Sequence, residues 1–455
     1  MDDRFSLAKS IGDGTLDLIC PQMELLVCPA YHESALAGSG VIRSNDKGQL
    51  YFKLTAPFTG KPHPALQRHR PPGEVYEEHD HVMLRAVDQY GREWRSNWLL
   101  LHLTMPTAQP SWFIRHNLER LICARATPLL KQSTMTLHIP AQDRLPFDQK
   151  TTETRCVGDR RISTGWSLDH HTCTLDDAEV TFRDRGDSWL SVTATRDSPI
   201  MPDWPGLICQ ALEFGTARRA RPAVAIRAFN DGEHIGLFSG PFLQYQSQLP
   251  PPVHAEKPTD AEHFWALIER FFMFAMRDDP RIETFLDELT GIRNGASASV
   301  QTACLTLAIG VESLCKLLLP SPSPSVHAES LKELVAYLKE WEGDESIKTR
   351  AVHMVNQFPS VRAVDRLYAW ASQHGVGHTL IDRWKELRHP KAHGTVVSED
   401  QSLYDHYYAV VELLYRMVAW AIGYKGPIVE TSKRGWGDVE DDQIAHNDTS
   451  SEGKD

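Results

Sequence analysis

The sequence lacks the features that mark several familiar classes of protein. Its eight cysteines include no Cys-x-x-Cys pair, which excludes a familiar zinc ribbon, and their scatter over 455 residues argues against a disulfide framework. No uninterrupted apolar run approaches the ~20 residues that a membrane-spanning helix needs. We also find no glycine-rich loop that would cradle a phosphate and no nucleophile elbow. We therefore expect buried, unpaired cysteines, no metal, no cofactor and no membrane contact.

Basic residues are also fewer than acidic residues. The chain has 48 Lys and Arg against 60 Asp and Glu, a net charge of −12. A polyanionic partner would therefore have to contact a local patch of the surface. The opening residues, MDDRFSLAKS, are acidic where a signal peptide would be basic and then apolar. Together with 41% hydrophobic and 24% charged residues, this favours a soluble, cytoplasmic protein.

The length predicts two or three domains, and the pattern up to residue 245 is mostly strand-like. Short runs of β-forming residues occur at 48–54 and 81–87. Two hairpins are predicted, EVTFRDRGDSWLSVTAT from residue 179 and VAIRAFNDGEHIGLF from residue 224, the second around an Asn-Asp-Gly turn. Helices are expected near 112–126 and 206–220. Residues 1–245 are thus predicted to form a β-rich domain with a few helices.

The second half has a different period. Residues 246–259, with three consecutive prolines, are predicted to be a linker. Beyond them a period of 3.6 residues indicates an all-α domain over 260–426, followed by an acidic tail at 427–455 that we expect to be disordered. One helix, at 298–319, is apolar nearly all round and is expected to be buried at the centre. The fold class is therefore α+β, with separate β-rich and all-α domains. The predicted helices lie at 261–278, 298–319, 330–341, 363–374, 379–388 and 402–426.

The stretch WKELRHPKAHG, residues 384–394, combines an arginine, two histidines, a proline and a glycine. In one unbroken helix, Arg388 and His393 would lie about 140° apart around the axis and could not share a face. Pro390 removes a backbone donor and biases His389 out of the helical region. We therefore expect the helix to end or kink at Arg388, with His393 beyond the bend.

An arginine and a histidine at such a bend suit the cleavage of RNA. Arginine offers a planar fork of donors to phosphate oxygens and keeps its charge. Histidine titrates near neutrality, at a pKa of about 6.5, and can move a proton. RNA supplies its own nucleophile, the 2′-hydroxyl, so this chemistry needs no metal.

The motif Arg388-x4-His393 resembles the R-x(4–6)-H motif of HEPN-domain ribonucleases. His389 fits the polar position after the arginine, and the ending AHG also fits, whereas Pro390 departs from the usual RN…AHG pattern. Glu312, the only acid within the apolar helix upstream, and the closing helix that ends AIGYKG agree with the family. A β-rich half before a HEPN half is similar to ApeA-type anti-phage proteins, with GSGVIRSNDKGQLYFKL carrying the N-terminal resemblance.

The resemblance implies a role for each of these residues. His393 would act as general base or acid at the 2′-hydroxyl, and Arg388 would bind the scissile phosphate and stabilise the pentacoordinate state. Glu312 would orient one of them, and His389 would assist. The protein would be a defence endoribonuclease, of abortive-infection or toxin type, that cuts RNA such as tRNA. It would pair through its HEPN domain as a homodimer, and a phage-derived trigger would act at the N-terminal domain.

Three other interpretations remain open on the sequence. The helical domain could be a non-catalytic HEPN module that binds nucleotide, RNA or a partner protein, with Arg388 paired to an acid such as Glu386 and His393 capping a helix. His79 and His81, on one side of a strand and with His63 and His69 upstream, could bind a metal as the centre of a metal-dependent hydrolase, although a solvated loop is the simpler interpretation. Basic clusters could guide RNA or a trigger, or be solvated faces. These clusters are 155–161 and Arg218, Arg219, Arg221 and Arg227.

Overall fold

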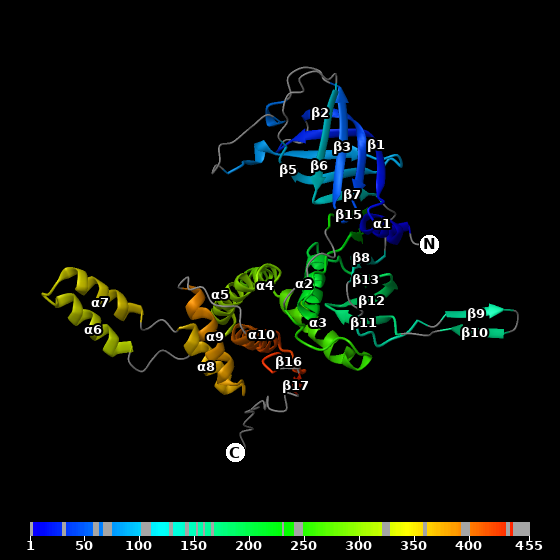
Figure 1. The fold of residues 1–455 in the computed structure, drawn as a ribbon. Helices are drawn as coiled ribbons and strands as arrows, with labels where there is room; N and C mark the ends of the chain where they lie inside the picture. The colour runs from blue at the N-terminus through cyan, green and yellow to red at the C-terminus, as the bar shows by residue number, and fades with distance from the viewer. Residues whose placement is uncertain are drawn as a thin grey trace, which may run out of the picture. The chain divides into compact units, whose positions relative to one another are not determined.

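The computed structural model divides the chain into two compact units, which we call the sheet unit and the helical unit. The sheet unit comprises residues 1–213, 218–245 and 255–261, and the helical unit comprises 214–217, 246–254 and 262–455. Figure 1 shows strands in the first and helices in the second. The residues that the structure describes are 3–29, 33–57, 63–66, 75–101, 111–126, 131–141, 145–151, 153–157, 160–164, 168–229, 232–240, 249–320, 328–357, 362–392, 401–433 and 437–439.

The sheet unit is built on a 13-stranded antiparallel sheet, in the order β11-β12-β13-β8-β14-β15-β7-β5-β4-β1-β2-β3-β6. The strands are β1 (Asp17–Val27), β2 (Ser34–Ser44), β3 (Leu50–Pro57), β4 (Val82–Val87), β5 (Glu93–Leu99), β6 (Ser111–Leu118), β7 (Arg120–Arg125), β8 (Ser133–Pro140), β11 (His170–Leu175), β12 (Ala178–Gly186), β13 (Trp189–Arg196), β14 (Val224–Phe229) and β15 (Gly232–Phe238). A separate pair joins β9 (Glu153–Val157) to β10 (Arg160–Thr164). Helix α1 (Asp3–Gly12) precedes the strands, and α2 (Trp204–Thr216) interrupts them. The expected β-rich N-terminal half is confirmed.

Alternation of buried and exposed residues explains the strands. In β3, Leu50, Phe52 and Leu54 are buried, while the residues between them face outward, as a half-buried strand requires. Strands β2 and β3 approach closely at Gly40 of β2, where a Cβ would overlap the carbonyl oxygen of Lys53 on β3. Only glycine leaves room for that pairing.

Both predicted hairpins are present. The first joins β12 to β13 through Asp187 and Ser188, whose φ angles are 52° and 62°. The second pairs β14 with β15 and brings Phe229 opposite Gly232; Asn230 and Asp231 lie outside the described residues. The helix expected near 206–220 is α2.

The helix predicted at 112–126 is wrong, because these residues form β6 and β7. In β6, Trp112 and Ile114 are buried with the exposed Phe113 between them, and in β7 Leu121 and Cys123 alternate in the same way. The apolar residues of this segment satisfy a period of two as well as a helical spacing. The pairing of β6 with β3 and of β7 with β15 selects the strand conformation.

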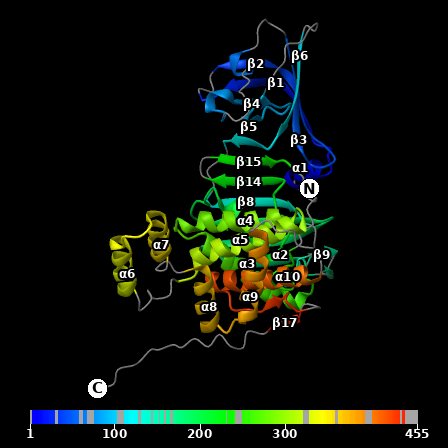
Figure 2. The ribbon, with the colours of Figure 1, turned by 60° about the vertical axis from the view of Figure 1, so that its left-hand side comes forward.

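The helical unit is all-α in its main part, as expected. Its helices are α3 (Ala261–Ala275), α4 (Arg281–Ala296), α5 (Val300–Leu318), α6 (Ala328–Glu340), α7 (Glu345–Gln357), α8 (Ala363–Gln373), α9 (His378–Ala392) and α10 (Gln401–Ile422). Helices α4 and α7 were not predicted. Helix α5 contacts α4, α8, α9 and α10, and α6 packs on α7 (Figure 2).

Helix α5 is central, but it is not buried all round. Leu307, Val311 and Leu314 are buried, whereas Leu305 is 37% exposed and Ile309 56% exposed. The expectation of a fully buried helix is therefore wrong for one face. By length and composition α5 could also span a bilayer, a test that core helices of soluble proteins pass as well.

The predicted linker is packed against the helical unit over residues 249–254. Leu249 and Val253 are buried. The hydroxyl of Tyr415 donates to the carbonyl oxygen of Pro250 at 2.6 Å, and the Val429 amide donates to that of Pro252 at 2.9 Å. Extended, proline-rich backbone makes no internal hydrogen bonds, so its carbonyl oxygens are free to accept from neighbouring elements.

Ordered structure also continues into the expected tail. Strand β16 (Ile428–Glu430) pairs with β17 (Gly437–Val439), and Ile428 is buried. The Thr431 hydroxyl donates to the carbonyl oxygen of Tyr408 on α10 at 2.6 Å. The boundary predicted at residue 427 is therefore too early, and residues 440–455 lie outside the described residues.

Candidate functional site

The candidate site lies where α9 packs against α5. Trp384 is fully buried, and its indole nitrogen donates to the carbonyl oxygen of Ala308 on α5 at 3.0 Å. Leu387, nearly one turn further along α9, is also buried. The Trp384 hydrogen bond and the burial of these two side chains fix α9, which packs on α5, and the next residue, Arg388, lies at the exposed edge.

Arg388 is held from two sides. Its Nε atom lies 2.7 Å from Oε2 of Glu312 on α5, and its guanidinium carbon lies 5.7 Å from the centre of the Trp384 ring. The Arg388 side chain is nevertheless 44% exposed. The structure thus brings together Arg388 and Glu312, two of the predicted site residues that are 76 positions apart in the sequence, and it leaves the cation accessible.

Glu312 carries a second cation, which the sequence analysis missed. The ammonium of Lys316, one turn further along α5, lies 2.8 Å from Oε1 of Glu312. Partial burial raises the pKa of Glu312, but the Lys316 hydrogen bond and the charge of Arg388 outweigh it and hold that pKa below its ordinary value. The carboxylate is therefore ionised between two cations, and the three groups sum to one positive charge. The spacing of Glu312 and Lys316, four apart on a predicted helix, could have indicated this pair.

The expectation that the helix ends at Arg388 is wrong, because α9 continues through Pro390 to Ala392. The other possibility, a kink at Arg388, stays a prediction. A proline inside a helix removes its own amide donor and crowds the carbonyl group four residues earlier, but the helical backbone can still run on for a few residues when its earlier turns are packed. The sequence also offered Glu386 as a partner of Arg388, and the structure pairs Arg388 with Glu312.

The other predicted residues are not brought into this site by the described structure. The backbone of His389 lies in α9, but its side chain is outside the described part of the chain, and so is the whole of His393. Their catalytic roles stay predictions.

Glu386 belongs to a separate cluster that the sequence analysis also missed. Its Oε2 atom lies 3.3 Å from Nη1 of Arg383 and 3.0 Å from Nε2 of His406, a residue of α10. Nη1 of Arg383 lies 2.6 Å from the same histidine nitrogen. Arg383 is therefore a second arginine of α9 with a carboxylate partner and a similar exposure of 48%, which makes it a natural control for Arg388.

The rival metal site at His79 and His81 is not assembled. His79 lies within a short 3-10 helix (Glu78–Asp80) and His81 directly follows it, and the strand begins only at Val82. His79 pairs with Glu77 and Asp80, and Nδ1 of His81 faces the Glu77 carbonyl oxygen at 2.8 Å. The two imidazoles therefore make separate local contacts at the entrance to a strand. Of the two histidines upstream, His63 pairs with Glu33, and His69 lies outside the described residues.

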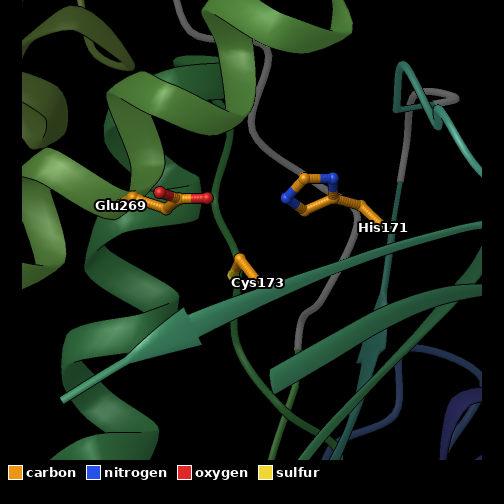
Figure 3. A group of neighbouring side chains, drawn as sticks. All are labelled: His171, Cys173 and Glu269. Carbon is orange, nitrogen blue, oxygen red and sulfur yellow. The ribbon is translucent and has the colours of Figure 1, made fainter. Parts of the chain in front are cut away.

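A second pair of potential metal ligands occurs on β11. Figure 3 shows His171 and Cys173, two residues apart on this strand, together with Glu269, which belongs to α3 of the helical unit. His171 hydrogen-bonds through Nδ1 to Asp148 at 2.9 Å. One imidazole and one thiol are fewer ligands than a zinc centre takes, so we assign no metal site to β11. The cysteines within the described residues form no disulfide bonds, and all but Cys173 are buried.

Comparisons with models of protein families, with curated proteins and with solved structures found no match to this chain. The candidate site therefore rests on its own geometry: an exposed arginine, oriented by an ionised glutamate, at the contact of two packed helices. Such a guanidinium can bind a phosphate through the donors that face away from the glutamate.

Proposed function

We propose that this protein is a metal-independent endoribonuclease of HEPN type that acts in anti-phage defence. The observation that carries the proposal is the contact between Arg388 and Glu312. It joins the arginine of the R-x4-H motif to the one acid of the apolar helix upstream, as the resemblance to HEPN ribonucleases implies.

In the proposed reaction, His393 accepts the proton of an RNA 2′-hydroxyl, and the 2′-oxygen attacks the adjacent phosphorus. Arg388 binds the phosphate and stabilises the charge of the pentacoordinate state. The bond from phosphorus to the 5′-oxygen then breaks, and that oxygen takes up a proton. The products are a 2′,3′-cyclic phosphate and a free 5′-hydroxyl. Glu312 positions Arg388 and does not itself exchange a proton, and His389 assists.

A second histidine is needed if one imidazole removes a proton while another delivers one. We propose that it comes from a second copy of the chain, paired through the helical unit by an isologous interface. The exposed Leu305 and Ile309 support this, because they lie on the same face of α5 as Glu312 and Lys316, at spacings of three and four residues. A dimer that covered the apolar end of this face would bring two candidate sites near each other.

The N-terminal half is proposed to restrain the nuclease until a phage-derived trigger binds it. The candidate site uses no metal or cofactor whose supply could limit its activity, so restraint has to come from elsewhere in the chain or from a partner. A trigger acts by binding one arrangement of the chain better than another.

The competing function is a HEPN module that binds nucleotide, RNA or a partner protein without cleaving RNA. It is favoured by one observation: the Arg388 guanidinium already has a carboxylate partner, as a purely structural arginine would. Such a module would bind RNA through Arg388 and leave it intact.

The test is cleavage of total RNA and tRNA by the purified chain in EDTA. Arg388→Ala and His393→Ala should each lower the cleavage rate by about 10²–10³-fold, the usual cost of losing a group that stabilises transition-state charge. Arg383→Ala is the matched control, because it removes an equally exposed, carboxylate-paired arginine from the same helix. Equal rates for Arg388→Ala and Arg383→Ala would reject the site, and binding without cleavage by the unaltered chain would establish the non-catalytic module.

A further inference from the structure

A cavity of about 910 Å³ opens at one end of the sheet unit. Its wall is formed where β5 and β6 end, where β7 begins and where β15 ends, so that residues far apart in the sequence meet there. This volume lies within the range that holds drug-sized ligands and cofactors.

One wall of the cavity presents aromatic rings. Trp98, at the end of β5, is 50% exposed although it is a large apolar side chain. The ring of His81 lies 5.7 Å from the Trp98 ring and is tilted by 38° to it. An exposed indole beside an imidazole is a surface on which a planar ring can stack.

The rim adds positive charge. Arg120, the first residue of β7, and Arg221, from one of the basic clusters in the sequence, both line the cavity and are exposed. Within the described part of the chain neither has an ion pair. The lining also includes one acid, Glu119, which accepts a hydrogen bond from Asn97 at 2.9 Å. Two guanidinium groups are thus available to a ligand.

A larger cavity of the same unit provides a contrast. It measures about 1150 Å³ and is lined by Arg4, Arg92 and Asp17, among others. There Arg4 pairs with Glu233, Arg92 with Asp88 at 2.8 Å, and Asp17 with Arg43 at 2.9 Å. With Arg125 and Glu93 counted, this lining holds three cations and three anions, whereas the cavity beside Trp98 holds Arg120 and Arg221 against Glu119 alone, so the cavity beside Trp98 is the better site for an anion.

The cavity also contains a neutral imidazole. His116, on β6, also lines it, and burial lowers its pKa below the ordinary value. A neutral imidazole offers one donor and one acceptor, which matches the mixed donors and acceptors on the edge of a nucleobase.

We propose that this cavity binds a nucleobase and its phosphate, either as a free nucleotide or as one residue of a single-stranded RNA. Trp98 stacks on the base, His116 contacts its edge, and Arg120 and Arg221 bind the phosphate. The site would give the sheet unit a ligand of defined chemistry, independent of the candidate nuclease site.

The experiment is calorimetric titration of the full-length chain carrying Arg388→Ala, so that RNA is not consumed by the proposed nuclease. The probes are AMP, adenosine, inorganic phosphate and a ten-nucleotide oligoadenylate. Trp98→Ala should weaken the binding of AMP and of adenosine roughly five- to 150-fold, the effect of losing one stacked base. Arg120→Ala and Arg221→Ala should weaken AMP binding and leave adenosine binding unchanged.

Two variants outside the cavity serve as controls. Phe113→Ala removes an aromatic ring of β6 that is 69% exposed, and Arg115→Ala removes an arginine whose guanidinium lies 4.5 Å from the Tyr51 ring. Both should bind AMP as tightly as the parent chain.

The outcomes separate the two sources of the ligand. Binding of AMP with this pattern of variants supports a nucleotide site, and binding of the oligoadenylate alone, with the same pattern, supports a site for RNA. The proposal is overturned if none of the nucleotide probes binds, or if Trp98→Ala binds them as tightly as Phe113→Ala. Because the readout is binding to a chain that lacks Arg388, these results do not depend on the proposed ribonuclease activity.

Discussion

Replacing Glu312 with glutamine tests whether the carboxylate positions Arg388. The change keeps the size of the side chain and removes the charge that faces Nε of Arg388 at 2.7 Å and Nζ of Lys316 at 2.8 Å. The Arg388 and Lys316 side chains are 44% and 54% exposed, and ion pairs of that exposure contribute about 1 kcal/mol or less to stability. The variant should therefore fold normally and show almost the same unfolding midpoint in denaturant.

The rate of RNA cleavage should respond far more strongly than the stability. Without its carboxylate partner the guanidinium is free to move, and an error of about 1 Å in the placement of a reacting or stabilising group can cost roughly 10²-fold in rate. We expect kcat of Glu312→Gln to fall by about ten- to one-hundredfold while KM changes little. Glu386→Gln, which disturbs the other arginine of α9, is the control and should retain the full rate.

The pH profile separates positioning from proton transfer. The pKa of Glu312 is held below its ordinary value of 4.5, so the carboxylate stays ionised at all pH values above that and its ion pair weakens only below it. A fall in activity between about pH 7 and pH 5 would therefore come from a histidine, whose ordinary pKa is about 6.5. Glu312→Gln should lower the whole profile without shifting it. A full rate for Glu312→Gln, or a loss of rate no larger than that of Glu386→Gln, would refute the positioning role.

Three further predictions concern the rest of the chain. The active protein should be a homodimer through its helical unit, and light scattering that shows a strict monomer under fully active conditions would contradict this. A variant that lacks residues 1–245 keeps the packed segment 249–254. It should be more toxic to cells than the full-length chain if the sheet unit restrains the nuclease. A truncated protein that is soluble and dimeric but less toxic would indicate that the sheet unit recruits RNA and does not restrain the nuclease. Gly40→Ala should destabilise the sheet unit by more than about 1 kcal/mol, because its Cβ meets the carbonyl oxygen of Lys53. Gly206→Ala, whose Cβ has open space in α2, should be neutral or stabilising by about 0.5–1 kcal/mol, and denaturant unfolding compares the two.

The sequence predicted the two kinds of architecture well, because hydrophobic periodicity is a local property. It failed at 112–126, where the same residues satisfy either period and the pairing of β6 with β3 decides between them. It also failed for Leu305 and Ile309, since which side of an apolar helix is covered depends on helices that are distant in the sequence. The proximity of Glu312 to Arg388 came from the resemblance to a family and could not come from spacing, because 76 residues separate them.

The hydrogen bond between the Trp384 indole and the Ala308 carbonyl oxygen has a consequence for how an RNA would be selected. A slip of α9 along α5 by one residue is a movement of about 1.5 Å, and it would break this bond inside an apolar contact where no water could replace it. The packing of α9 on α5 therefore fixes the position of the Arg388 backbone, and only the end of the Arg388 side chain is free to adjust. An RNA that reaches the site has to bring its phosphate to that point, so the flexibility needed for the encounter is supplied by the RNA. Loops and unpaired ends, whose backbone bends at little cost, would be cut in preference to regular duplex.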